Sequence, residues 1–324
     1  MLKLTNALLA IVGGVLGAMA LFWLLNAVTE RLSPKWEQRL KPYVFVGPAM
    51  LIVTLFLLYP ALRTVMLSFF GADSEEFVGL QNYQELATDP TLRSVVWNNL
   101  LWIIVVPISA VAIGLAVAVL ADRLRPRPES FVKSLIFLPM AISFVGAGTI
   151  WGFMYAWRPE GTDQIGLLNA IWTAFGGSPQ TWLQVSQFQI NNFLLMVIMV
   201  WLQSGFAMVL LSAAIKNVPE ETIEAARTDG ATEVQIFSRI IVPQIASTIA
   251  VVFTTITILV LKVFDIVFVM TGGNFGTDIV ANRFITELFS FRQFGRASVL
   301  VVALMATTVP IMIYNIKQFR KQET

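Results

Sequence analysis

The chain has 324 residues, of which 56% are hydrophobic and 13% are charged, and its formal net charge is +2. A soluble domain of this size carries about a quarter charged residues, so this composition excludes an ordinary water-soluble fold. A charge near zero gives no basic surface for nucleic acid. The absence of cysteine and histidine removes the usual ligands of zinc and haem, and it excludes Ser-His and Cys-His nucleophile pairs.

Apolar residues are gathered in blocks, and the mean hydropathy is +0.73. Seven blocks reach the roughly 20 residues that a helix needs to cross the hydrocarbon core of a membrane. They cover residues 6–28, 43–69, 97–121, 132–157, 192–215, 245–271 and 297–316. We therefore predict an all-α bundle of about seven transmembrane spans, and although the last two blocks contain some polar residues, each is expected to be helix and not loop.

The first block has a second interpretation. Lys3, the apolar run after it and Ala18-Met19-Ala20 resemble a cleavable signal peptide. The apolar run continues through 22–25, however, and cleavage would leave the basic stretch 31–41 outside, so we favour a retained helix. We expect residues 1–42 to form an extra transmembrane helix with a cytoplasmic linker, and residues 43–324 to form a core of six spans.

Basic residues predict the orientation, because cytoplasmic connections retain lysine and arginine. Fourteen basic residues lie in alternate connections at 31–41, 123–133, 216–239 and 317–321, and only six lie in the opposite set. The C-terminus is then cytoplasmic, and seven spans place the N-terminus outside.

Residues 217–243, between the fifth and sixth spans, form the most informative connection. Pro219 followed by two glutamates suits a first helical turn, and Gly230 permits a left-handed turn. A second short helix is expected from Ala231. On this pattern alone, the segment is either an ordinary amphipathic cytoplasmic loop or a docking element.

The same segment resembles the loop signature of permease subunits of ABC (ATP-binding-cassette) importers. That signature is Glu-Ala-Ala, three residues, glycine, nine residues and Ile-x-Leu-Pro, and Val242 stands here where leucine is usual. The resemblance implies a type I importer fold and a coupling helix that docks on a partner ATPase. The residues that it assigns to coupling are Glu224, Ala225, Ala226, Asp229, Gly230, Ala231, Phe237, Ile240 and Pro243.

The resemblance also implies partners. The chain has no Gly-x-x-x-x-Gly-Lys phosphate loop, so ATP and Mg would be bound by a separate ATPase and this chain would hold no cofactor. We expect a second homologous permease, two ATPase subunits and an extracytoplasmic solute-binding protein, with membrane lipid around the spans. The implied location is a bacterial inner membrane.

Further segments resemble the carbohydrate-uptake branch that includes the maltose system. They include Gly79-Leu80-Gln81-Asn82-Tyr83, Trp201-Leu202-Gln203-Ser204-Gly205-Phe206 and Lys262-Val263-Phe264-Asp265. The last string and the extra first helix are most like α-glucoside permeases. The expected substrate is a sugar, glucoside or sugar-type compatible solute; a non-sugar solute is the alternative.

Sugars are bound by aromatic faces and neutral hydrogen-bonding groups, which predicts a site near the middle of the membrane. The candidates are Trp201, Gln203, Phe206, Thr257, Val260, Lys262 and Asp265. Trp201 and Gln203 also suit helix packing. Lys262 and Asp265 are expected on one helical face as an intramembrane ion pair, with either a functional or a structural role.

Two other classes of function, an ion-coupled secondary transporter and an intramembrane enzyme, fit the sequence less well. An ion-coupled secondary transporter would carry buried acids within its spans and inverted repeats. Asp265 is almost the only acid in these spans. An intramembrane enzyme would need a group of titratable residues, which the composition does not provide.

Overall fold

The computed structural model describes residues 2–31 and 33–320. The chain packs as two units, Met1–Met66 and Leu67–Thr324. The regular secondary structure of the described residues is helical, apart from an isolated bridge between Phe70 and Phe77, and non-helical connections join the helices. Five helical segments are long and apolar enough to cross a membrane, and two bent helix pairs pass the same test. These seven segments match the seven predicted apolar blocks.

The N-terminal unit contains α1 (Leu2–Thr29) and α2 (Pro34–Val53), followed by a π-helical turn at Thr54–Leu58 and by α3 (Tyr59–Leu67). Pro34 lies at the start of α2, where its missing N–H removes no helical hydrogen bond. The rings of Phe22 and Phe45 stack 6.0 Å apart and join α1 to α2. The basic stretch after residue 33, expected as a linker, is therefore helical and continuous with the second span.

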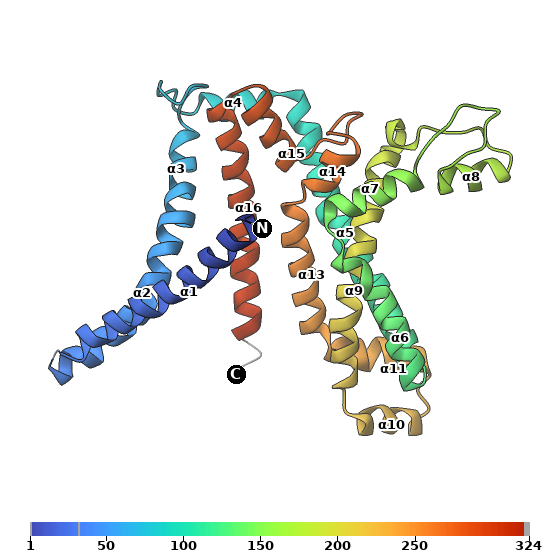
Figure 1. Ribbon diagram of the computed structural model, residues 1–324. Coiled ribbons are helices and arrows are strands. Elements are labelled where there is room, and N and C mark those ends of the chain that lie inside the picture. Colours follow the sequence, from blue (N-terminus) through green and yellow to red (C-terminus); the bar gives the residue numbers. More distant parts are fainter. Residues whose placement is uncertain (1, 32, 321–324) are drawn as a thin grey trace. The chain divides into compact units, whose positions relative to one another are not determined.

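The core of the C-terminal unit is built on α5 (Pro90–Ala121) and α9 (Ile190–Lys216). The two helices run parallel, because Asn98 lies beside Asn192 and Gly114 lies beside Ala207 further along both. A Cβ at Gly114 would lie 2.6 Å from that of Ala207, so only glycine allows this approach. Helix α13 (Ala246–Leu261) packs against both (Figure 1).

Two predicted spans are broken. The span predicted at 132–157 consists of α6 (Pro126–Phe137), a 3-10 turn at Leu138–Ala141 and α7 (Phe144–Met154), with a bend of 104°. Pro139 lies in the turn, and the Ser143 hydroxyl accepts a hydrogen bond from the N–H of Gly146 to begin α7. The apolar block at 132–157 therefore corresponds to two helices joined by a sharp turn.

The span predicted at 245–271 is also interrupted. The chain bends by 69° between α12 (Val242–Gln244) and α13, and α13 ends at Leu261. A separate helix, α14 (Asp265–Met270), follows and packs on α7. The expected single helix therefore ends well before residue 271.

The two ends of the C-terminal unit differ. At one end lie α10 (Glu220–Thr228) and α11 (Glu233–Ile236), and at the other lie α4 (Gln81–Thr88) and α15 (Val280–Ile285) (Figure 1). The long connection from α7 to α9 contains the short helix α8 (Leu167–Ala174). Helix α16 (Phe294–Arg320) runs from the α4 end toward the other. A small second core fixes α4, α5, α15 and α16 together through Leu86, Val95, Val280, Val299 and Leu300.

Candidate functional site

The connection after α9 forms the predicted helix–turn–helix. Helix α10 begins after Pro219, with Glu220 and Glu221 in its first turn. Gly230 has φ +81°, the left-handed conformation expected for it, and its N–H donates to the carbonyl of Arg227 at 3.0 Å. The second helix begins at Glu233, two residues later than Ala231, because Thr232 and Gln235 form a capping box.

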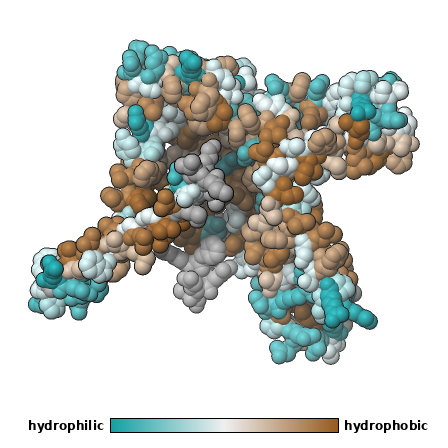
Figure 2. Space-filling model, in the orientation of Figure 1, coloured by the Kyte–Doolittle hydropathy of each residue, from teal (hydrophilic) through white to brown (hydrophobic). Residues whose placement is uncertain are grey.

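The surface of this loop is mostly exposed, as a docking element requires. Ile236, 1% exposed, is its one fully buried apolar anchor among the described residues of α10 and α11, and the motif did not single it out. Arg227 and Glu233 join the two helices through an ion pair of 2.9 Å, and this hydrogen bond raises the pKa of the arginine. Hydrophilic side chains gather at this end of the unit (Figure 2).

A groove of about 330 Å³ lies beside the turn. It brings together four of the nine predicted coupling residues with two others; its lining is Asp229, Gly230, Ala231, Gln235, Arg239 and Ile240. Glu224 and Ala225 are exposed on α10, whereas Phe237 is half-buried and opens the π-helical turn that follows α11. Pro243 is exposed in α12. The predicted coupling residues thus lie on one loop, with the glycine turn at the edge of a groove.

The predicted substrate residues are not brought to one surface. Gln203, Thr257 and Val260 are buried in the helix packing. The Thr257 hydroxyl donates to the carbonyl of Phe253 in its own helix at 2.8 Å. Gln203 differs from these neighbours, because its Oε1 is buried and has no hydrogen-bond partner in the described part of the chain.

Trp201 and Phe206 are half-buried. The Trp201 ring meets Trp151 edge to face, with centroids 5.8 Å apart, and Trp151 lies 5.4 Å from the ring of Tyr155. These three rings form an aromatic row across α7 and α9. The predicted aromatic character of this region is present, although part of it serves helix packing.

The predicted ion pair between Lys262 and Asp265 on one helical face is wrong. Helix α13 ends at Leu261, and Phe264 has a non-helical backbone, so the two residues do not share a helical face. Among the ion pairs of residues 2–31 and 33–320, none joins them within 4.0 Å. The pattern of i and i+3 failed because the helix is interrupted between them.

Asp265 instead lines a cavity of about 390 Å³ with residues from the other broken span. Ile142 and Ser143 belong to the break before α7, and Phe144 begins that helix. Irregular backbone at membrane depth is tolerated where protein or a cavity surrounds it, and such breaks carry substrate sites in transporters. The meeting of two helix breaks at one cavity is a feature that the apolar runs of the sequence do not indicate.

Four asparagine side chains fix the loop between α14 and α15: Asn98, Asn99, Asn191 and Asn192. Asn98 donates to the carbonyls of Gly276 and Asp278, each at 2.8 Å. Asn191 donates to the carbonyl of Phe275, and Asn99 accepts from the N–H of Val280, also at 2.8 Å. We call these four residues the asparagine clamp. It attaches the loop to the N-terminal half of α5 and to the first turn of α9.

The fold and these features define a helical membrane protein with an exposed helix–turn–helix loop at one end. The chain belongs to the binding-protein-dependent transport system inner membrane component family, which matches residues 110–319.

Two curated relatives are similar over nearly their whole length. The osmoprotective compounds uptake permease protein GgtC of Synechocystis sp. is 54% identical, over 86% of this chain and 99% of the relative. The alpha-glucoside transport system permease protein AglF of Rhizobium meliloti is 46% identical, over 99% of this chain and 98% of the relative.

A solved structure supports the fold. A chain in the crystal structure of a bacterial alginate ABC transporter, in complex with an alginate pentasaccharide-bound periplasmic protein, superposes with a TM-score of 0.75. The match covers 90% of this chain and 98% of that chain at 18% identity.

Proposed function

We propose that this chain is the permease subunit of an ATP-driven importer for a glucoside or a related sugar-type solute. The observation that carries the proposal is the exposed α10–α11 loop with its left-handed Gly230, in a chain of this family. The substrate class is supported by the names of the relatives, one an alpha-glucoside permease and one a permease for osmoprotective compounds.

The energy comes from a separate ATPase that holds ATP and Mg. The loop is its docking element, and the groove beside Gly230 accepts a side chain of the ATPase surface. The groove carries both Asp229 and Arg239, so a polar partner of either charge is complemented there. Glu224 and Ala225 are exposed on α10 and Ala226 is half-buried, and the small alanine side chains allow a partner to approach closely.

The solute passes along the region between the aromatic row and the two broken spans. Trp201 and Phe206 supply apolar faces, and Gln203 supplies an amide whose oxygen has no partner within the described residues. Asp265 contributes an acceptor for hydroxyl groups at the cavity where the breaks meet. Thr257, Val260 and Lys262 complete the proposed lining in the assembled transporter.

The complete importer contains a second permease, two ATPase subunits and an extracytoplasmic solute-binding protein. One docking loop serves one ATPase, and a pair of ATPases requires a second such loop. The membrane orientation places α10 in the cytoplasm and the asparagine clamp outside, with the N-terminus outside. The excess of basic residues in the connections on the α10 side supports this orientation.

Native mass spectrometry of the complex purified through a tag on this chain tests the proposal. The expected composition is this chain, a different homologous permease and two ATPase subunits. A complex with two copies of this chain and full transport would reject the heteromeric arrangement and leave the importer function in place. A purified chain that carries no ATPase, under conditions that preserve transport, would contradict the proposed energy source.

A further inference from the structure

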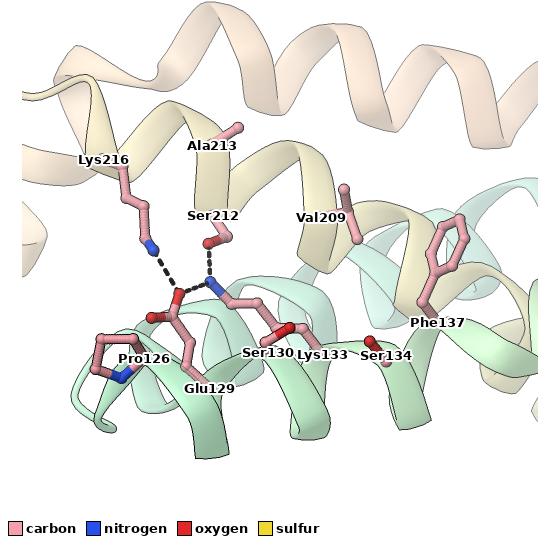
Figure 3. A pocket seen from close by; sticks show the side chains of 10 residues that line it. All are labelled: Pro126, Glu129, Ser130, Lys133, Ser134, Phe137, Val209, Ser212, Ala213 and Lys216. Atoms are coloured by element: carbon pink, nitrogen blue, oxygen red, sulfur yellow. Dashed lines mark hydrogen bonds and ion pairs between the residues drawn. The ribbon is translucent and has the colours of Figure 1, made fainter.

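Four charged side chains from three helices meet at the α10 end of the C-terminal unit. The Lys133 ammonium lies 2.5 Å from Asp122 Oδ1 and 2.6 Å from Glu129 Oε1. Lys216 binds the same Glu129 oxygen from the other side (Figure 3). Asp122 follows the last residue of α5, Glu129 and Lys133 belong to α6, and Lys216 is the last residue of α9.

Most of this cluster is shielded from water. The side chains of Lys133, Asp122 and Glu129 are 17%, 16% and 14% exposed, whereas Lys216 is 54% exposed. A charge removed from water destabilises the protein unless it is paired. A movement of α9 against α6 is therefore tolerated only if the charges find other partners.

The cluster offers Lys216 a second partner. Its ammonium lies 3.9 Å from Asp122 Oδ1, while its bond is to Glu129. The other oxygen of Asp122, Oδ2, is buried and has no hydrogen-bond partner among the residues that the structure describes. Two carboxylates on different helices thus compete for one cation, and one of them has an unused acceptor.

Space for a movement lies beside the pair. A groove of about 640 Å³ lies along the contact between α6 and α9, with Ser130 and Ser134 on one wall and Val209 and Ala213 on the other (Figure 3). Lys216 is also the point at which α9 leaves the bundle for α10. A force applied to α10 consequently reaches the Lys216 pair before the rest of α9.

We infer that Lys216 is an ion-pair switch, bound to Glu129 of α6 in this state and to Asp122 of α5 in another state of the transport cycle. The exchange lets α9 shift against α6 without leaving a shielded charge unpaired. Lys216 is in this sense a positioning residue, acting through the helices and not on the solute. The inference rests on the proposed function, because it takes the force on α10 from a docked ATPase.

The distance between α6 and α9 measures the switch directly. The chain contains no cysteine, so Ser130→Cys with Ala213→Cys places one spin label on each wall of the groove without a competing site in this chain. The labelled complex is examined in lipid, without nucleotide and trapped with ATP and vanadate. We expect two different distance distributions.

The charge variants then assign that change to Lys216. Glu129→Gln is expected to move the nucleotide-free distribution toward the trapped one, because Asp122 becomes the remaining charged partner. In Asp122→Asn, the distances between the two labels are expected to remain those of the nucleotide-free wild type under both conditions. In Asp122→Asn, the ATP hydrolysed per solute transported should rise about fivefold, the lower end of a typical allosteric coupling.

Lys41→Gln is the matched control, because Lys41 forms a comparable but less shielded ion pair with Glu37 at 3.1 Å in the N-terminal unit. This variant should leave unchanged both the distances between the two labels and the ATP hydrolysed per solute transported. Identical label distances in the two nucleotide states, in an otherwise normal complex, would overturn the switch alone. The switch would also be overturned if Asp122→Asn showed the wild-type ratio of ATP hydrolysed per solute transported and the wild-type distances between the two labels. A wild-type chain that binds no ATPase would overturn the proposed function and the switch together.

Discussion

Gly230 sets the geometry of the α10–α11 loop, because its φ of +81° is one that residues with a Cβ rarely adopt. A left-handed conformation costs an L-residue roughly 1–2 kcal/mol, and a β-branched residue resists it most. Gly230→Val is therefore expected to rearrange the turn, abolish uptake and weaken ATPase binding while the protein remains abundant in the membrane. Uptake assays and membrane immunoblots measure both effects.

Gly176→Val provides the matched control for that variant. Gly176 has φ +85°, and neither glycine has another group within 4 Å of an added Cβ, so the backbone strain is alike. Gly176 lies in the connection after α8, far along the chain from α10. Normal transport in Gly230→Val, or an equal loss in both variants, would argue against a docking role for the turn.

At the level of the helices, the asparagine clamp attaches a loop to α5 and α9, and it predicts a loss of stability. Asn98→Ala removes two hydrogen bonds of 2.8 Å and leaves the carbonyls of Gly276 and Asp278 without these donors. An unsatisfied buried group costs about 1–3 kcal/mol. The variant should unfold at a lower temperature in detergent and become protease-sensitive between residues 271 and 280.

Asn217→Ala is the comparison, since Asn217 is exposed at the end of α9. It should leave the unfolding temperature within experimental error of the wild type. An equal effect of the two variants would mean that the clamp contributes no more than a surface residue.

The sequence predicts the spans and the Gly230 turn well, because both depend on local properties. Apolar length decides whether a helix crosses a membrane, and glycine in a helix–turn–helix decides where the chain reverses. The break before α7 had a local signal in Pro139, which the apolar run concealed. The break at Lys262 has no proline or glycine within it. Its cause is tertiary, as α14 packs on α7.

Contacts between side chains of different helices could not be predicted from the sequence either. Asn98 and Asn191 are 93 positions apart, and their common role appears only when α5 and α9 lie parallel. Lys216 and Glu129 are separated by 87 positions, and positive charge near a helix end predicts orientation without naming a partner. The buried Gln203 oxygen, which has no partner among the residues that the structure describes, likewise depends on packing that the sequence pattern does not contain.

For the whole molecule, the proposed membrane orientation predicts on which side of the membrane added reporters will lie. A reporter fused after Thr324 and one inserted at 122–130 should both report the cytoplasm, and one beside Gly176-Gly177 should report the outside. The physical reason is the retention of basic connections on the cytoplasmic side. An external reporter after Thr324 would require a different number of spans. If N-terminal sequencing of the mature protein began at Leu21, the segment before it would be a cleaved signal peptide and not a retained transmembrane helix.

The most direct test of the account is ATP-dependent uptake in proteoliposomes that contain the purified complex, its solute-binding protein and a labelled α-glucoside. Complexes with this chain should accumulate the glucoside only when ATP is supplied on the α10 side, and Gly230→Val should reduce accumulation to background. Accumulation driven by an ion gradient without ATP, or equal accumulation when this chain is omitted, would contradict the assignment of this chain as the permease of an ATP-driven importer.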